Sequence, residues 1–126
     1  MNFITLADTT DEIVVCTQAD VDQANDFLTE IAHRMLVKDV EIITPVALTA
    51  KRLGIVYALY IAAVREIGKD NLTSLNTEST RQDIYAQKAK FFKEELDKLE
   101  PEIRASDFTG KELGNFATLR MWYGGY

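Results

Sequence analysis

The side chains that could carry out chemistry in this chain are few. It has one histidine, His33, and one cysteine, Cys16, whereas nucleophilic and metal sites usually combine several such residues. His33 stands beside Glu30 and Arg34 on a predicted helix, and we interpret it as a surface or interface histidine rather than a ligand or general base. Cys16 has no neighbouring base or cation in the sequence that would lower the pKa of its thiol, so we interpret it as a small hydrophobic residue.

Three carboxylates recur at four-residue spacing: Asp22, Asp26 and Glu30. This spacing places them on one face of a helix, where they could contribute to a divalent-cation site. Side chains on a single helix face diverge, however, so a cation would need further ligands from elsewhere, and a solvated acidic face is the simpler interpretation. Gly124-Gly125 is followed by neither a helix nor a lysine, unlike a phosphate-binding loop. We therefore predict no catalytic residue, no cofactor and no metal, in a protein that is not an enzyme.

The first element that positions these side chains is a helix predicted over residues 18–36. Thr17, followed three residues later by Asp20, indicates a capping box at its start. Apolar residues then recur every three or four positions, which is typical of a helix with one buried face. Before it, residues 1–17 are predicted to form an extended arm with, at most, brief strand character.

A second helix is predicted to begin at Thr44-Pro45, with proline at its first position, and to end near Ile67 with a left-handed cap at Gly68. Its stretch 53–64 carries no charge on any face but is too short to span a membrane. One small chain has few elements with which to surround such a helix. Part of its surface is therefore expected to meet another subunit, through Ile55, Leu59, Tyr60 and Ala63.

A third helix is predicted after a polar loop over residues 70–79, with Thr77 or Ser79 as its cap. Its exposed side is rich in charges, among which Glu94 and Lys98 are correctly ordered for an ion pair one turn apart. Pro101 indicates a break or a short extra turn through Ala105. The predicted fold class is mainly α, a small bundle of three to four helices with an extended N-terminal arm and an extended C-terminal tail.

The C-terminal tail, residues 107–126, differs in composition from the predicted helical domain, residues 1–106. It holds the only tryptophan, five of the twelve aromatic residues and four of the six glycines. Its rings could fold back on their own core or dock on a partner, and we favour a partner because Trp, Tyr, Met and Arg are residue types that anchor interfaces. The predicted partner-binding residues are Phe116, Leu119, Arg120, Met121, Trp122, Tyr123 and Tyr126.

The net charge of −6 is concentrated in the first third of the chain. Residues 1–37 contain seven acids and one base, and the other 89 residues contain thirteen of each. Such an excess of acid repels phosphate backbones and argues against specific nucleic-acid binding. The single cysteine excludes an internal disulfide, and the N-terminus lacks the basic flank and long apolar region of a signal peptide. We therefore expect a protein that is assembled in the cytoplasm.

Five short stretches, distributed over residues 3–100, resemble the small helical head-to-tail connector proteins of tailed bacteriophages, also called adaptor or head-completion proteins. They are Ile4-Thr5-Leu6, Ala24-Asn25-Asp26-Phe27-Leu28, Thr44-Pro45-Val46-Ala47-Leu48, Tyr57-Ala58-Leu59-Tyr60 and Tyr85-Ala86-Gln87-Lys88. The resemblance rests on pattern and length rather than on a diagnostic motif. Members of that family form a ring, usually of twelve subunits, beneath the portal after DNA packaging, and the family has no catalytic residues.

The resemblance implies a location in the virion neck and three kinds of partner: the portal protein, neighbouring copies of the chain, and a downstream tail or stopper protein. DNA would pass through the ring without specific binding, and no membrane is involved. The tail would bind the portal or an adjacent copy. The acidic face formed by Asp22, Asp26 and Glu30 would line or flank the channel, or would be a solvated outer face. A small acidic regulatory protein acting as a dimer is the alternative.

Overall fold

A computed structural model of the chain describes residues 2–69 and 76–110. These residues form a mainly α bundle, as predicted, and contain no strand, so the strand character allowed for the arm is absent. The α-helices are α1 (Gln18–Arg34), α2 (Leu48–Lys69), α3 (Asn76–Leu99) and the single turn α4 (Ser106–Thr109). Three short 3-10 turns are η1 (Leu6–Asp8), η2 (Asp39–Glu41) and η4 (Glu100–Glu102).

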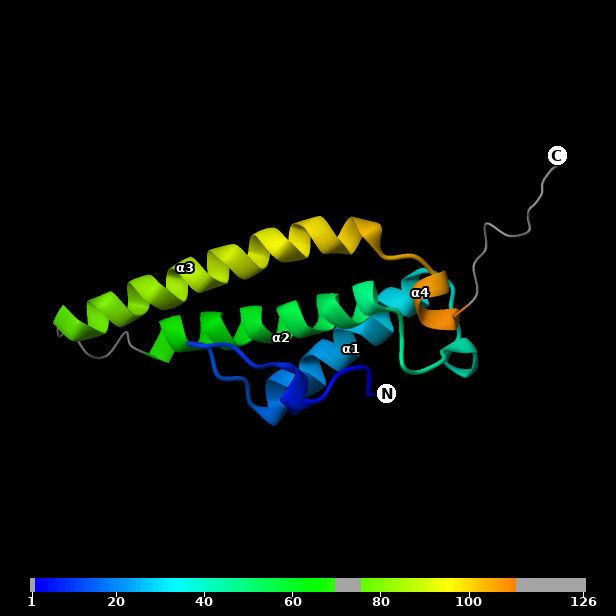
Figure 1. Ribbon diagram of the computed structural model, residues 1–126, viewed down its shortest axis with the longest axis horizontal. Helices are drawn as coiled ribbons and strands as arrows, with labels where there is room; N and C mark the ends of the chain where they lie inside the picture. Colours follow the sequence, from blue (N-terminus) through cyan, green and yellow to red (C-terminus); the bar gives the residue numbers. More distant parts are fainter. Residues whose placement is uncertain (1, 70–75, 111–126) are drawn as a thin grey trace.

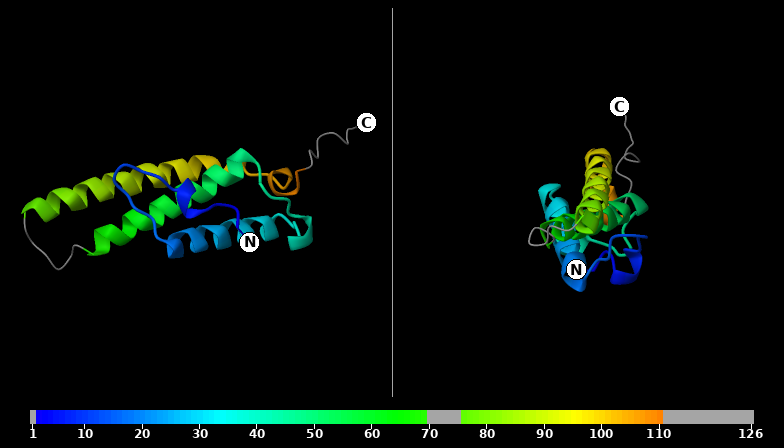
Figure 2. Two further views of the ribbon diagram at one scale, coloured as in Figure 1. Left: turned by 60° about the horizontal axis from the view of Figure 1, so that its bottom comes forward. Right: turned by 90° about the vertical axis from the view of Figure 1, so that its left-hand side faces the viewer.

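Helix α2 occupies the middle of the bundle (Figures 1 and 2). Helices α1 and α3 both run antiparallel to α2 and both pack against it. The N-terminal arm lies along α1 and α2, and α4 lies at the end of the bundle where α1 ends and α2 begins (Figure 1). The described part of the chain is therefore arranged around one central helix.

The predicted capping box of α1 is confirmed. The amide of Thr17 donates to Asp20 Oδ2 at 2.8 Å, and the amide of Asp20 donates to Thr17 Oγ1 at 3.4 Å. The helix ends at Arg34, two residues earlier than predicted. The chain turns at Leu36, whose φ of 65° lies in the left-handed region, and the amide of Val37 donates back to the carbonyl of Ala32 at 3.0 Å. This is the Schellman geometry that usually places glycine where Leu36 stands.

The predicted ends of the other two long helices are corrected. Helix α2 begins at Leu48 rather than at Thr44-Pro45, because the preceding residues bond to α4: the amides of Ile43 and Ala47 donate to the carbonyls of Phe108 and Asp107. Gly68 lies inside α2 and is not its left-handed cap. Helix α3 begins at Asn76, so the predicted caps Thr77 and Ser79 lie within it. On its exposed side the observed ion pair joins Lys93 to Asp97 at 3.1 Å, not Glu94 to Lys98.

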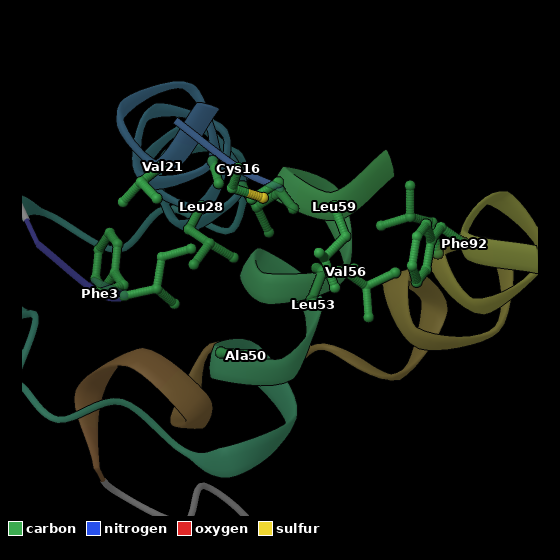
Figure 3. Packing of buried hydrophobic residues seen from close by; sticks show 14 of the residues in the cluster. Phe3, Cys16, Val21, Leu28, Ala50, Leu53, Val56, Leu59 and Phe92 are labelled. Carbon is green, nitrogen blue, oxygen red and sulfur yellow. The ribbon is translucent and has the colours of Figure 1, made fainter. Parts of the chain in front are cut away.

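The hydrophobic core forms on two sides of α2 (Figure 3). Phe3 and Leu28 lie on one side of the helix and Phe92 of α3 lies on the other. The short turn expected at Pro101 is present as η4 but ends at Glu102 rather than at Ala105, and the chain then returns to the core with Ile103 and Phe108, both of them buried. Phe108 meets Phe3 edge to face, with ring centroids 6.0 Å apart. The arm and α4 therefore close the same core as the three long helices.

Small residues let the central helix approach its neighbours closely. Gly54 of α2 faces α1, and a Cβ at this position would lie 2.6 Å from Leu28 Cδ1 and 3.4 Å from Ile4 Cγ2. Both neighbours are buried, so neither side chain has free space into which to move. The absence of a side chain at position 54 thus sets the distance between α1 and α2.

The N-terminal arm is fixed by a buried asparagine. Asn25 Oδ1 accepts hydrogen bonds from the amides of Phe3 at 2.8 Å and Ile4 at 3.0 Å, and its Nδ2 donates to the carbonyl of Ile4 at 3.3 Å. Asn25 thereby satisfies backbone groups that the arm, lacking a sheet partner, would otherwise bury without hydrogen bonds. One side chain of α1 takes the place of a neighbouring strand.

Replacing Asn25 with alanine is expected to lower the free energy of unfolding by about 2–4 kcal/mol, because two buried amides lose their acceptor. Urea unfolding measures the loss, and hydrogen exchange at Phe3 and Ile4 should accelerate more than exchange within α3. Asp26→Ala, at the exposed neighbouring position, is the control and should change stability by about 0.5 kcal/mol or less. Equal losses in the two variants would contradict the role given to Asn25.

Replacing Gly54 with alanine is expected to destabilise the protein by about 1–2 kcal/mol, although alanine is the better helix former. The methyl group would overlap Leu28, and the displaced side chain would strain the α1–α2 contact. Urea unfolding of the single variants Gly54→Ala and Leu28→Ala and of the double variant measures the coupling. The double variant should lose less stability than the two single losses added together, and strict additivity would contradict the proposed contact.

Candidate functional site

Six of the seven acidic residues of the first third divide into an inward set and an outward set, and the seventh, Glu12, is exposed on the arm. The inward set is Asp8, Asp11 and Asp20, and each of the three pairs with a base from a later helix: Lys51 at 3.7 Å, Lys88 at 3.2 Å and Arg65, respectively. The outward set is Asp22, Asp26 and Glu30, all exposed on α1 as predicted from their spacing. Some of the acids that make the first third negative therefore stabilise the fold through ion pairs, and the others form an exposed acidic face.

Asp20 is the most buried member of the inward set. Its carboxylate accepts from the Arg65 guanidinium and from the amide of Thr17, so one side chain caps α1 and ties it to the far end of α2. Burial acts to raise the pKa of Asp20, but the hydrogen bonds from Arg65 and Thr17 outweigh it and the pKa lies below its usual value. The same pair raises the pKa of Arg65, chiefly through the hydrogen bond to Asp20.

Asp11 ties the arm to α3. Its Oδ2 accepts from the amides of Ile13 and Val14, both at 3.0 Å, and its Oδ1 accepts from Lys88 Nζ at 3.2 Å. Burial opposes ionisation, yet these hydrogen bonds hold the pKa of Asp11 below its usual value. The arm is thus held at both of its ends, by Asn25 near Phe3 and by Lys88 near Val14.

Two of the three outward acids, Asp26 and Glu30, border a hollow between α1 and α2. Asp26, Glu30 and His33 contribute to its lining, its volume is about 450 Å³, and Phe27 stacks on Tyr57 beside them with ring centroids 4.1 Å apart. Carboxylates next to aromatic faces suit a cationic side chain of a partner. Within the described part of the chain, no three His, Cys, Asp or Glu side chains gather as a metal site would require.

His33 and Cys16 occupy different environments, His33 at the surface and Cys16 in the core. His33 is exposed, and its Nε2 lies 2.6 Å from Asp39 Oδ1 of η2, a contact that its sequence neighbours Glu30 and Arg34 did not indicate. Cys16 is buried in the core, and burial raises the pKa of its thiol even though Arg65 lies near it. This agrees with the interpretation of Cys16 as a small hydrophobic residue.

The subunit interface predicted on α2 is corrected in part. Leu59 and Ala63 are buried within their own chain and have no surface for a neighbouring copy. Ile55 and Tyr60 are partly buried and pack against the same core. The prediction is wrong for Leu59 and Ala63 because α1 and α3 pack against α2 and cover these positions within one chain.

The tail residues predicted to bind a partner, from Phe116 to Tyr126, lie outside the described residues. The predicted boundary between domain and tail does change, however. Asp107 and Phe108 belong to α4, the ring of Phe108 is fully buried, and Gly110 caps the turn with a φ of 72°. The helical body therefore extends at least to residue 110, and the tail begins no earlier than residue 111.

Sequence reasoning missed a group of exposed apolar side chains where α1 connects to α2. We call Leu36, Val40, Ile43 and Leu48 the connection surface; their exposed fractions are 88%, 91%, 54% and 80%. A hollow of about 450 Å³ lies beside Leu36, lined also by Val37, Lys38 and Asp39. Leu36 is unusual in two respects. Its left-handed backbone conformation costs a non-glycine residue about 1–2 kcal/mol, and its side chain is so exposed that burial of apolar surface offsets little of this cost.

Comparison of the chain with protein-family models, with curated proteins and with solved structures finds no match. Among the described helices, none combines the length and the apolar character that crossing a bilayer requires.

Replacing Asp20 with asparagine is expected to lower the free energy of unfolding by about 2 kcal/mol at neutral pH, because the Arg65 guanidinium loses a buried charged partner. The folded-state pKa of Asp20 lies below the unfolded value of 3.8, so its contribution is complete above that pH and disappears as pH falls through the folded value. Urea unfolding at a series of pH values should show the gap between wild type and Asp20→Asn closing below about pH 4. Asp22→Asn is the exposed control, and a gap of unchanged size in acid would contradict the assignment.

Proposed function

We propose that this chain is a structural adaptor of a tailed-phage neck, which forms a ring beneath the portal and joins the DNA-filled head to the tail. The proposal starts from the five stretches that resemble head-to-tail connector proteins. Several of their residues have defined structural roles: Asn25 fixes the arm, Phe27 stacks on Tyr57, and Leu28 packs against Gly54. The resemblance therefore involves residues that shape the body, not only surface positions.

The observation that carries the proposal is that the core of the helical body is closed by Phe108. The buried cluster draws side chains from the arm and from each of the four α-helices up to that residue. The segment after it, residues 111–126, contains Phe116, Met121, Trp122 and Tyr123. Large apolar anchors that follow an already closed core suit docking on another polypeptide, such as the portal or a neighbouring copy.

The exposed acidic face of α1 fits the wall or the mouth of a DNA channel. Asp22, Asp26 and Glu30 are exposed and side by side, and negative charge repels the phosphate backbone, so DNA slides without being retained. The proposed partners are the portal above, identical copies on either side, and a tail or stopper protein below. Identical weak interfaces become stable together when a symmetric template holds the copies.

The proposal is tested by adding the purified chain to DNA-filled, portal-containing particles from the encoding phage that lack their own neck proteins. Negative-stain imaging should show a ring of fixed symmetry at the portal vertex. A chain truncated after Gly110 should bind these particles at least about tenfold more weakly, because the anchors are gone. The matched control is the full-length variant Asp22→Asn/Asp26→Asn/Glu30→Gln, which keeps the tail and should still bind.

Two results would contradict the proposal in different ways. Equal binding by the truncated and full-length chains would refute a role of the tail in assembly at the portal vertex, whether the tail contacts the portal or a neighbouring copy. A defined dimer in solution, with no affinity for portal-containing particles, would favour the alternative of a small acidic regulatory protein.

A further inference from the structure

The connection surface is the place in the described structure where large apolar side chains are most exposed. Leu36, Val40 and Leu48 are each exposed by 80% or more. Leu36 follows the end of α1, Val40 belongs to η2 and Leu48 begins α2, and these segments lie at the same end of the bundle (Figures 1 and 2). Three large apolar side chains left this exposed at one end of the bundle are candidates for contact with a partner surface.

The chain leaves its helical body beside this surface. The amide of Ile43 donates to the carbonyl of Phe108 at 2.8 Å, and a Cβ at Gly110 would lie 3.8 Å from Ile43 Cδ1. Sixteen residues follow Gly110, and they carry the only tryptophan together with Phe116, Met121 and Tyr123. The aromatic segment therefore starts at residue 110, next to the connection surface.

The positions of the anchors favour docking between copies over docking within one copy. The segment begins with Lys111, Glu112, Leu113, Gly114 and Asn115, and its large rings come later. Because an extended chain spans about 3.3 Å per residue, Trp122 and Tyr123 can reach roughly 40 Å from Gly110. The first five residues, which leave the connection surface of their own chain, carry no aromatic ring, and the reach of the later rings is long enough to extend to the equivalent surface of an adjacent copy.

We propose that residues 111–126 of one copy dock on the connection surface of a neighbouring copy, with Met121, Trp122 and Tyr123 packing against Leu36, Val40, Ile43 and Leu48. Asp39 and Glu41 flank Val40 in η2 and are both exposed, so they would attract the positive charge of Arg120, although Asp39 also contacts His33 and Glu41 accepts from the amide of Lys38. A contact between two different surfaces of identical chains is head-to-tail and closes into a ring when the rotation permits. The inference rests on the proposed function in one respect, because it requires several identical copies side by side. It assigns the tail to a neighbouring copy rather than to the portal.

Tryptophan fluorescence reports on the docking of the tail directly, because Trp122 is the only tryptophan of the chain. For the full-length protein, we expect the Trp122 emission maximum to shift to shorter wavelength as concentration rises, in parallel with association in sedimentation velocity. A maximum at short wavelength that does not change on dilution would show docking within one copy and would overturn the proposal. A maximum typical of exposed tryptophan up to millimolar protein would overturn it as well.

The surface is tested with the full-length variant Leu36→Gly/Val40→Asp. Glycine suits the left-handed backbone at position 36, so the single variant Leu36→Gly should raise the thermal midpoint while weakening association. For the double variant we expect at least about tenfold weaker association. The control is Val15→Asp, which removes another exposed apolar side chain, 74% exposed, and should associate as the wild type does. Unchanged association of the double variant would overturn the proposal.

A mixture of two variants isolates a single contact. The variant Trp122→Ser/Tyr123→Ser has an intact connection surface but no tryptophan, and Leu36→Gly/Val40→Asp has an intact tail but an altered surface. Adding the first to the second should shift the emission of the second to shorter wavelength, and no shift would overturn the proposal. These experiments need no portal, so the docking inference can fail while portal binding is retained, and the reverse outcome is equally visible.

Discussion

The structure depends on the need to cover α2 on almost every side. The stretch 53–64 carries no charge, and its exposure to water would cost about 25 cal/mol for each square ångström of apolar surface. Helix α1 covers one side and α3 another, and Gly54 allows α1 to approach until Leu28 touches the helix backbone. The arm and α4 complete the cover with Phe3, Ile4 and Phe108. The N-terminal arm and α4, which the sequence suggested to be extended segments outside the bundle, are therefore parts of the core.

This arrangement explains how the acids of the first third are used. An arm without a sheet partner must find hydrogen bonds elsewhere, and it obtains them from Asn25 and from carboxylates that bond to backbone amides. Asp11 and Asp20 combine such bonds with ion pairs to Lys88 and Arg65, so they join segments that are distant in sequence. Only acids that face away from α2, such as Asp22 and Asp26, remain for the outer surface. The net charge of a region thus says little about its surface charge until inward and outward side chains are separated.

Local signals predicted what local interactions determine. The capping box of Thr17 and Asp20, the existence of three long helices and the exposure of the acidic face all follow from spacing within one or two turns. The failures have long-range causes. Helix α2 starts late because Ile43 and Ala47 bond to α4, which lies some sixty residues away in sequence, and Leu59 is buried because α1 and α3 both pack against α2. Leu36 offers no signal at all, since a left-handed turn is expected at glycine or asparagine and not at leucine.

Leu36 is a poor choice for the stability of the body but a suitable one for a binding surface. In the isolated body glycine would serve the turn better, because leucine adds backbone strain and leaves most of its side chain in water. Val40 and Leu48 are similarly exposed and contribute little to their own core. The described body buries little of these side chains, and the docking proposed above would remove them from water. This group of side chains lies beside Gly110, where the described body ends. The proposed docking surface and the start of the aromatic segment are therefore at the same end of the molecule.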